Sequence, residues 1–334
     1  MLRVYGYNNV EIPSTLNSSI QFSTKPDHEK IQNTVANLLS NNGYYEMMCL
    51  SLTKGDYAEQ LKDIDAKQNV SMLNPLSSDL NVLRQTMLFS GLETIAYNQN
   101  RKQANLKLYE FGKTYLVNDT DGGKKYTENK NLSLFLTGLK QSEGWNSSKD
   151  QYNFYSLKGV VLGIIEQLGI TGFKLQENDN QAFSNGLKYT WKKQELVSFG
   201  TVSKEICKLM GIKQEVHYAN FNWSVLVEAL QKNKVMYTEV AKFPEVRRDL
   251  ALLLNNNITF SELEKLAFEA ERKILKAVNL FDVYEGSKLP SGKKSYALSF
   301  TLQDSNATLT DKQIDKVMDK LIKVYQEKVS AELR

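Results

Sequence analysis

The sequence predicts an α+β protein in two parts, and three observations support this fold class. Strand-like stretches in the first 235 residues are joined irregularly by helices and loops, without the strand–helix alternation of a parallel sheet. The segment QKNKVMYTEVAKF, roughly residues 231–243, breaks this pattern and is typical of a domain boundary. After it, strands and helices follow in the order βαββαβ. We therefore expect a mostly antiparallel sheet with flanking helices, followed by a ferredoxin-like domain whose open sheet face suits RNA or small ligands.

Three helices are expected in the first part, each from apolar residues at helical spacing. The first runs over 25–43, where Asp27 can cap the start and Gly43 can end the helix. The second runs from about Leu88 to Asn98, and the third, YSLKGVVLGIIEQLGI, has the longest apolar stripe. The strands expected around them are YYEMMCLSL, LKLYEFGKTYLV, NLSLFLTGL, LKYTWKK and ELVSFGTVS, with turns at NPLSS and NDTDGGKK.

The second part has clearer signals. RRDLALLL is a strand, and TFSELEKLAFEAERK is a helix that the pair Thr259–Glu262 can open as a capping box. LKAVNLFDVYEG and KKSYALSFTLQD are two strands around the turn SKLPSG. LTDKQIDKVMDKLIKVYQEKV is a helix with Thr310–Gln313 as its box, and AELR can close a fourth strand.

Composition excludes several classes of protein. The 334-residue chain has a net charge of +4, so any RNA contact must come from a local basic patch. Cys49 and Cys207 stand far apart without a CxxC partner, which favours a reduced, cytoplasmic protein over a disulfide or zinc protein. The start has no apolar stretch typical of a signal peptide, and the longest apolar runs are too short for a membrane span. Because LRVYGYNNV has the pattern of an element's end, we expect a fragment of a longer protein.

Catalytic signals are weak. His28 and His217 have no serine or cysteine nearby in a nucleophile motif, and each is more typical of a surface or packing histidine. The stretch DTDGG lacks the acidic ladder of a calcium loop, so we expect a solvated hairpin tip. Arg84, within NPLSSDLNVLRQTMLFSGL, could be either a phosphate clamp or a structural residue.

Several motifs together resemble a known family. RVYGYNNV, NPLSSDLNVLRQTML, LYEFGKTY, FPEVRRDLALL and FDVYEG…LPSGKKSYALSF are similar to the C-terminal part of the bacterial phenylalanyl-tRNA synthetase beta subunit, in order and over essentially the whole chain. The resemblance implies that residues 1–12 are the tail of a preceding domain. It implies that residues 13–235 are a non-catalytic class II synthetase-like core and that 240–334 are a ferredoxin-fold anticodon-binding domain.

The resemblance also implies two partners. The core would dock on the catalytic alpha subunit through an apolar patch, with YYEMMCLSL and the helix near MLFSGLETIAY as candidates to flank it. The last domain would bind the anticodon stem-loop of tRNA(Phe). ATP, phenylalanine and Mg²⁺ would serve the intact two-alpha, two-beta enzyme. The family's magnesium ligands precede the RVYGY stretch, so no metal or cofactor is expected in this chain.

The arginine content supports the expectation of a non-catalytic core. A triphosphate needs fixed cationic donors, and arginine is favoured because its planar fork contacts phosphate twice. A class II site takes one arginine from its second motif and another from a glycine-rich strand–helix motif near its end. Between Arg101 and Arg247 there is no arginine, and ELVSFGTVSKEI stands where the last motif would be. We therefore predict no catalytic residue, and a structural role for Arg84 in holding the NPLSSDLN loop.

The candidates for RNA binding lie in FDVYEGSKLPSGKKS. Asp282 and Tyr284 share one side of a strand, and we expect the turn to return Lys293, Lys294 and Ser295 beside them. A tyrosine ring can stack on an unpaired base, a carboxylate can accept from guanine, and lysines hold phosphates. From spacing alone, Tyr284 is more typical of a residue that packs on the sheet, and Asp282 is more typical of an acidic residue in a turn. In the family, this Asp and Tyr face the guanine at the first anticodon position. Lesser candidates, for a phosphate contact, are Arg247 and Arg248.

Two alternative functions stay open at this point. One is a free-standing class II-like ligase that activates a small acid with ATP, against which the missing arginines count. The other is a regulatory protein whose ferredoxin-like domain binds a small molecule. Titration against amino acids and tRNA would distinguish it from a tRNA-binding protein.

Overall fold

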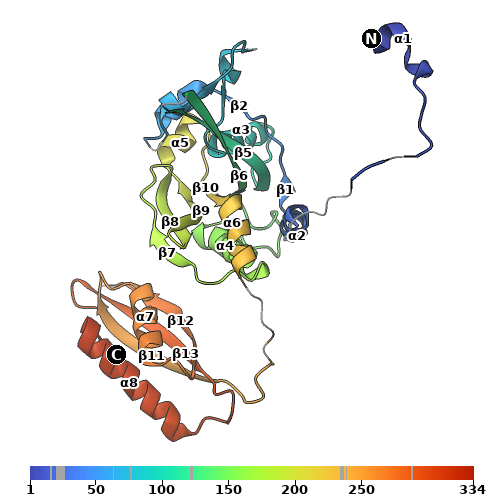
Figure 1. Ribbon diagram of the computed structural model, residues 1–334. Coiled ribbons are helices and arrows are strands. Elements are labelled where there is room, and N and C mark those ends of the chain that lie inside the picture. Colours follow the sequence, from blue (N-terminus) through green and yellow to red (C-terminus); the bar gives the residue numbers. More distant parts are fainter. Residues whose placement is uncertain are drawn as a thin grey trace. The chain divides into compact units, whose positions relative to one another are not determined.

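The computed structural model describes residues 1–15, 17–19, 27–62, 64–75, 77–120, 123–233, 237, 239–286 and 289–334. The chain divides into two compact units, Met1–Val235 and Met236–Arg334, each with its own hydrophobic core (Figure 1). The predicted α+β class is confirmed. Parts of five expected features lie outside the described residues: the start of the first helix, the turn NPLSS, the tip of NDTDGGKK, the boundary segment and the turn SKLPSG.

Within the described ranges, the first unit is built on a seven-stranded sheet in the order β1-β5-β6-β10-β9-β8-β7. The β1–β5 pair is parallel and the other pairs are antiparallel. These strands are β1 (Tyr45–Glu46), β5 (Leu106–Thr120), β6 (Gly123–Thr137), β7 (Lys174–Glu177), β8 (Phe183–Trp191), β9 (Gln194–Val202) and β10 (Val216–Asn222). A small second sheet pairs β4 (Val82–Leu83) with β2 (Leu52–Thr53) and β3 (Val70–Ser71).

Two clusters of buried side chains cover the two faces of the large sheet, because alternate residues of each strand point to opposite faces. One cluster packs three amphipathic helices, α2 (His28–Asn41), α4 (Phe154–Gln167) and α6 (Trp223–Lys232). The other packs α3 (Leu88–Gln99) and α5 (Lys204–Leu209). The predicted cap of α2 is confirmed, since the Asp27 side chain accepts from the backbone N–H groups of Glu29 and Lys30. The start of the chain forms α1 (Leu2–Tyr5), which buries no residue.

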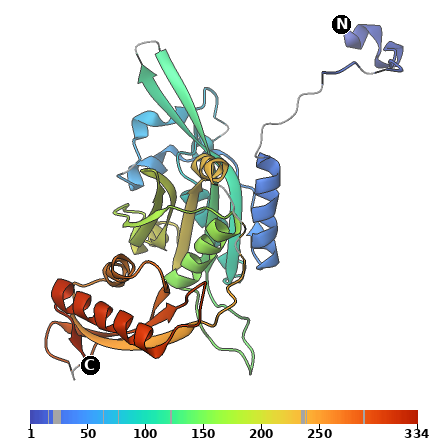
Figure 2. The ribbon, with the colours of Figure 1, turned by 60° about the horizontal axis from the view of Figure 1, so that its bottom comes forward.

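The structure corrects two strand predictions in this unit. YYEMMCLSL is not one strand, because only its two ends pair: β1 lies in the large sheet and β2 begins at Leu52 in the small one. The predicted loop NDTDGGKK is shorter than expected, because β5 continues to Thr120 and β6 starts at Gly123. These two strands form a long hairpin that extends away from the body of the unit (Figure 2).

The second unit is a four-stranded antiparallel sheet in the order β12-β13-β11-β14, which confirms the ferredoxin-like fold. Helices α7 and α8 both cover the same face, where alternate strand residues form the core (Figures 1 and 2). At the start of α8, the Gln313 side chain accepts from the Thr310 backbone N–H and hydroxyl, as expected of its capping box. The elements are β11 (Val246–Asn255), α7 (Phe260–Ala270), β12 (Leu275–Tyr284), β13 (Lys293–Leu302), α8 (Asp311–Val329) and β14 (Glu332–Leu333).

No helix in the described part of the chain is long and apolar enough to cross a membrane.

Candidate nucleic-acid interface

The face of the second unit's sheet that α7 and α8 leave uncovered, which we call the open face, carries most of the predicted RNA contacts. The ladder pairs Asp282 with Ala297 and Tyr284 with Ser295. Leu298 and Phe300, on the same strand as Ala297, alternate with these positions and point into the core. Asp282 and Tyr284 therefore lie on the open face, as the spacing predicted.

The predicted lysine pair is split between the two faces. Lys293 lies at the end of the open face and forms an ion pair with Glu332 of β14. Lys294 was expected beside Tyr284, and this placement is wrong. It is opposite the core residue Leu254, it is buried, and its Nζ donates to the backbone oxygen of Asn256 at 2.9 Å. Adjacent residues of a strand point to opposite faces, so two neighbouring lysines cannot both face a ligand on one side.

The arginine pair is split in the same way. Arg247 lies on the open face, where Nε is 2.8 Å from Asp249 Oδ1 and the guanidinium carbon lies 5.1 Å from the centre of the Phe281 ring. Arg248 is opposite the core residue Phe300, and its Nη2 lies 3.6 Å from a carboxylate oxygen of Asp311 at the start of α8. Only Arg247 of the two is placed to contact a ligand on the open face.

The open face has two separate ends. Arg247 pairs with Thr301 and Tyr284 pairs with Ser295, six residues apart along β13. At about 3.3 Å per residue, roughly 20 Å separates these two ends. A ligand that contacts both must be as large as several nucleotides. Ser295, which is buried, forms part of the floor at the Tyr284 end.

Two residues that sequence reasoning missed shape the Tyr284 end. The guanidinium carbon of Arg334 lies 5.3 Å from the centre of the Tyr284 ring, within the range of a cation–π contact. A Cβ added to Gly286 would lie 2.6 Å from the Tyr284 hydroxyl, so the phenol occupies the space above this glycine. Arg334 is the last residue of AELR, the predicted fourth strand, and directly follows the observed strand β14.

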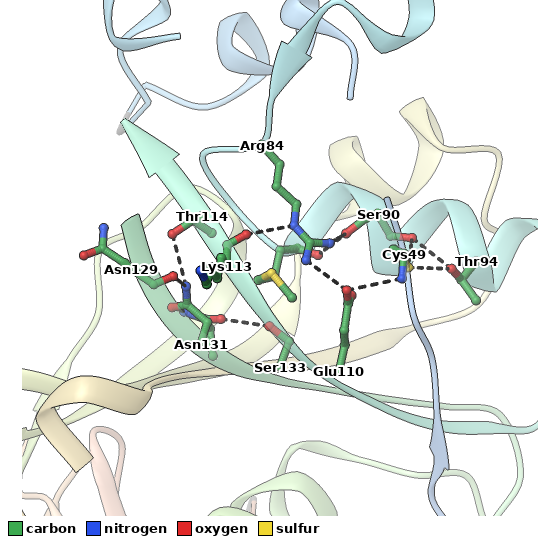
Figure 3. A network of polar contacts seen from close by, with 12 residues as sticks. Cys49, Arg84, Ser90, Thr94, Glu110, Lys113, Thr114, Asn129, Asn131 and Ser133 are labelled. Carbon is green, nitrogen blue, oxygen red and sulfur yellow. Dashed lines mark hydrogen bonds and ion pairs between the residues drawn. The ribbon is translucent and has the colours of Figure 1, made fainter. Parts of the chain in front are cut away.

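Arg84 lies in a buried network of polar contacts in the first unit (Figure 3). Its guanidinium donates to Glu110 Oε1 at 2.9 Å, to the Ser90 hydroxyl at 3.1 Å and to the Lys113 backbone oxygen at 3.0 Å. Arg84 and Glu110 are both 3% exposed. The predicted structural role is confirmed, but Arg84 fastens β5 to α3 rather than the NPLSSDLN loop.

The surroundings of Arg84 do not fit a nucleotide or a metal. The cavity beside it has a volume of about 20 Å³, enough for one water molecule and far too small for a triphosphate. A Cβ on Gly112 would lie 2.3 Å from Arg84 Nη2 and 2.4 Å from the end of Met87, so these side chains fill the space against the sheet. Among the described residues, no group of three or more His, Cys, Asp or Glu could hold a metal ion.

His217 and the two cysteines have environments that suit packing. His217 is buried on β10, where its two ring nitrogens lie 3.0 Å from Thr201 Oγ1 and 3.0 Å from the Tyr152 backbone oxygen. Burial lowers the pKa of His217, which keeps the ring neutral. Burial also raises the pKa of the Cys207 thiol to about 11 and raises that of Cys49, so neither is an activated nucleophile. His28 is exposed in the first turn of α2.

A second exposed surface lies on the first unit, and we call it the apolar patch. Its large side chains come from the two segments that the sequence indicated: Tyr45, Met48 and Leu50 from the stretch around β1, and Tyr97 from α3. Met48, Leu50 and Tyr97 border one hollow of about 360 Å³. Met48, at this hollow, is 96% exposed.

The folds and faces described above define a mixed α+β core joined to a ferredoxin-like domain of the kind that binds unpaired bases on its sheet. Residues 12–223 match the family described as "Phenylalanyl tRNA synthetase beta chain CLM domain", and residues 241–334 match "Ferredoxin-fold anticodon binding domain". The chain belongs to the phenylalanyl-tRNA synthetase beta chain family.

Curated relatives agree with this assignment. The chain is 46% identical over its whole length to the phenylalanine–tRNA ligase beta subunit of Bacteroides thetaiotaomicron, and 38% identical to that of Porphyromonas gingivalis. It spans 42% of the length of each of these relatives. Among solved structures, pyrrolysyl-tRNA synthetase from Desulfitobacterium hafniense aligns with a TM-score of 0.48 and 15% identity, over 62% of this chain and 70% of that one.

Proposed function

We propose that the second unit binds the anticodon stem-loop of tRNA(Phe) as part of phenylalanine–tRNA ligation in the cytoplasm. The observation that carries this proposal is the Tyr284 end of the open face. An aromatic ring, held by Gly286 beneath and Arg334 beside it, stands two residues from the exposed carboxylate of Asp282. The ring can stack on a base, and the carboxylate can accept from the two N–H groups on guanine's Watson–Crick edge.

The charges of the open face favour RNA over a small anionic ligand. Arg247 and Lys293 mark its two ends and each has one carboxylate partner. A phosphate can replace or share such an exposed partner, because exposed ion pairs contribute little on their own. The distance between the ends suits a looped strand with several phosphates rather than a single amino acid.

We further propose that the first unit is not catalytic and docks on the alpha subunit through the apolar patch. Arg84 supports the first statement, since all of its bonds are directed to protein groups in a buried site. ATP and Mg²⁺ would then serve the intact enzyme through residues outside this chain. Phenylalanine-dependent pyrophosphate exchange by the purified chain alone, above a buffer blank, would contradict this part.

The test of RNA binding uses the purified 334-residue chain and a labelled anticodon stem-loop of tRNA(Phe), with a stem-loop of scrambled loop sequence as the control. We expect measurable and loop-dependent binding that weakens as salt is raised. Equal binding of both stem-loops would contradict anticodon recognition.

Docking is tested by capture of the cognate alpha subunit. Capture should fail when Met48→Asp is introduced, and it should persist in the control variant Lys316→Asp on α8.

A further inference from the structure

The turn between β8 and β9 has an unfavourable backbone for its sequence. Trp191 pairs with Gln194, so Lys192 and Lys193 alone form the turn. Their φ angles are +47° and +70°, and a two-residue turn with both φ angles positive strongly prefers Asn-Gly. A side chain with a Cβ is disfavoured in this region of φ, and two adjacent ammonium groups also repel each other. The sequence therefore has two lysines in a turn whose φ angles suit Asn-Gly better.

A third lysine joins this pair. The Lys192 Nζ lies 4.5 Å from the centre of the Trp191 ring, and the Lys232 Nζ, from the end of α6, lies 5.6 Å from the same ring. Trp191 is itself only 6% exposed. Both ammonium groups therefore lie within the range of a cation–π contact with one buried ring.

Few carboxylates neutralise the cluster formed by Lys192, Lys193 and Lys232. Lys232 forms an ion pair with Glu228, one turn earlier in α6. Within the described ranges, no carboxylate lies within ion-pair distance of Lys192 or Lys193. The exposed Glu195 follows two residues later. The tip of the hairpin is a local concentration of positive charge on a chain whose net charge is only +4.

We propose that Lys192 and Lys193 contact the phosphate backbone of RNA, outside the anticodon arm. RNA fits better than a protein partner, because the tryptophan that would anchor a protein is buried beneath the lysines, and the exposed groups are ammonium groups. Phosphates would also offset the mutual repulsion of the lysines. The choice of tRNA as the RNA rests on the proposed function.

The test replaces the turn by its preferred sequence, Lys192→Asn with Lys193→Gly, in the 334-residue chain. The probe is a tRNA(Phe) transcript from which the anticodon arm has been deleted, bound at several salt concentrations. Losing two phosphate contacts should weaken binding roughly ten- to thirty-fold at physiological salt, and should reduce the slope of log K against log salt by about 1.4–1.8. The matched control, Lys312→Gln with Lys316→Gln, removes the same charge from the exposed side of α8 and should bind like the parent chain.

The variant separates binding from folding, because the new turn should raise the unfolding temperature by roughly 2–6 °C. Lys192→Arg with Lys193→Arg, which keeps the charge, should bind the armless tRNA normally. The proposal is overturned if the parent chain does not bind the armless tRNA, or if the Asn-Gly variant binds it with unchanged affinity and salt slope.

Tyr284→Ala should leave armless tRNA binding intact. Failure of anticodon stem-loop binding would therefore overturn the proposed function, but not the proposed contact of Lys192 and Lys193 with RNA. Capture of an acidic protein at the turn without any RNA effect would replace RNA by a protein partner.

Discussion

Replacing Arg84 by methionine should destabilise the first unit strongly, because the Glu110 carboxylate would lose the cation that compensates its burial. Both side chains are 3% exposed and their ion pair is 2.9 Å long. Glu110 Oε2 already has no hydrogen-bond partner, so the carboxylate depends on what Oε1 receives from Arg84 and from the Cys49 backbone N–H at 3.3 Å. Breaking a buried pair by removing one partner costs about 3–5 kcal/mol of unfolding free energy.

A double-mutant cycle gives the sharpest form of this prediction. Glu110→Leu alone should also destabilise, since Arg84 would keep only its bonds to Ser90 and Lys113. The combined Arg84→Met and Glu110→Leu variant should lie within about 2 kcal/mol of the parent chain, because an apolar pair of similar size can replace a buried ion pair. The coupling between the two substitutions should therefore reach several kcal/mol.

Urea unfolding followed by tryptophan fluorescence measures these effects. All three tryptophans, at positions 145, 191 and 223, lie in the first unit, so the signal reports on that unit alone. A cost of less than about 1 kcal/mol for Arg84→Met would refute the structural account. The account would also be refuted if ATP stabilised the parent chain and this stabilisation disappeared in Arg84→Met, because a residue that binds nucleotide would behave in this way.

Three smaller predictions follow from other contacts. Burial lowers the pKa of His217 in the folded chain, so on acidification the unfolded chain takes up this proton first. Stability should therefore fall as the pH drops below about 6.5. In thermal melts at several pH values, His217→Gln should reduce this pH dependence of stability, and His28→Gln should not. Gly286→Ala should weaken anticodon stem-loop binding several-fold at unchanged stability, because the new Cβ would displace the Tyr284 hydroxyl; a binding assay that shows parental affinity would disprove this role. Lys294→Met should lower stability by about 1–3 kcal/mol in urea unfolding followed by circular dichroism, since the second unit has no tryptophan. The salt dependence of RNA binding should not change, because the Lys294 ammonium group donates to a backbone oxygen on the helix-covered face.

Local patterns predicted much of the fold. Asp27 and Thr310 start their helices as expected, and KKSYALSFTLQD forms the strand that its composition predicted. Prediction failed where the outcome depends on contacts far apart in sequence. YYEMMCLSL has the composition of a strand, but its middle stays irregular because only its ends find strand partners.

The candidate site shows the same division between local and distant information. The two-residue period of a strand places Asp282 and Tyr284 on one face of the sheet. The same period places the adjacent residues Lys293 and Lys294 on opposite faces. The contribution of Arg334 could not be predicted from spacing, because Arg334 contacts Tyr284 from a position 50 residues further along the chain. A pattern within one strand cannot report what a distant strand brings beside it.

The most direct test of anticodon recognition is the affinity of the chain for stem-loops that carry guanine or adenine at the first anticodon position. Tyr284→Ala should weaken binding of both by very roughly five- to a hundred-fold, because one base–aromatic stack contributes about 1–3 kcal/mol. Asp282→Asn should instead erode the preference for guanine more than it lowers affinity, since the amide can no longer accept from both N–H groups of guanine. If folded Tyr284→Ala binds both stem-loops as the parent chain does, and Asp282→Asn keeps the guanine preference, the open face is not the anticodon reader.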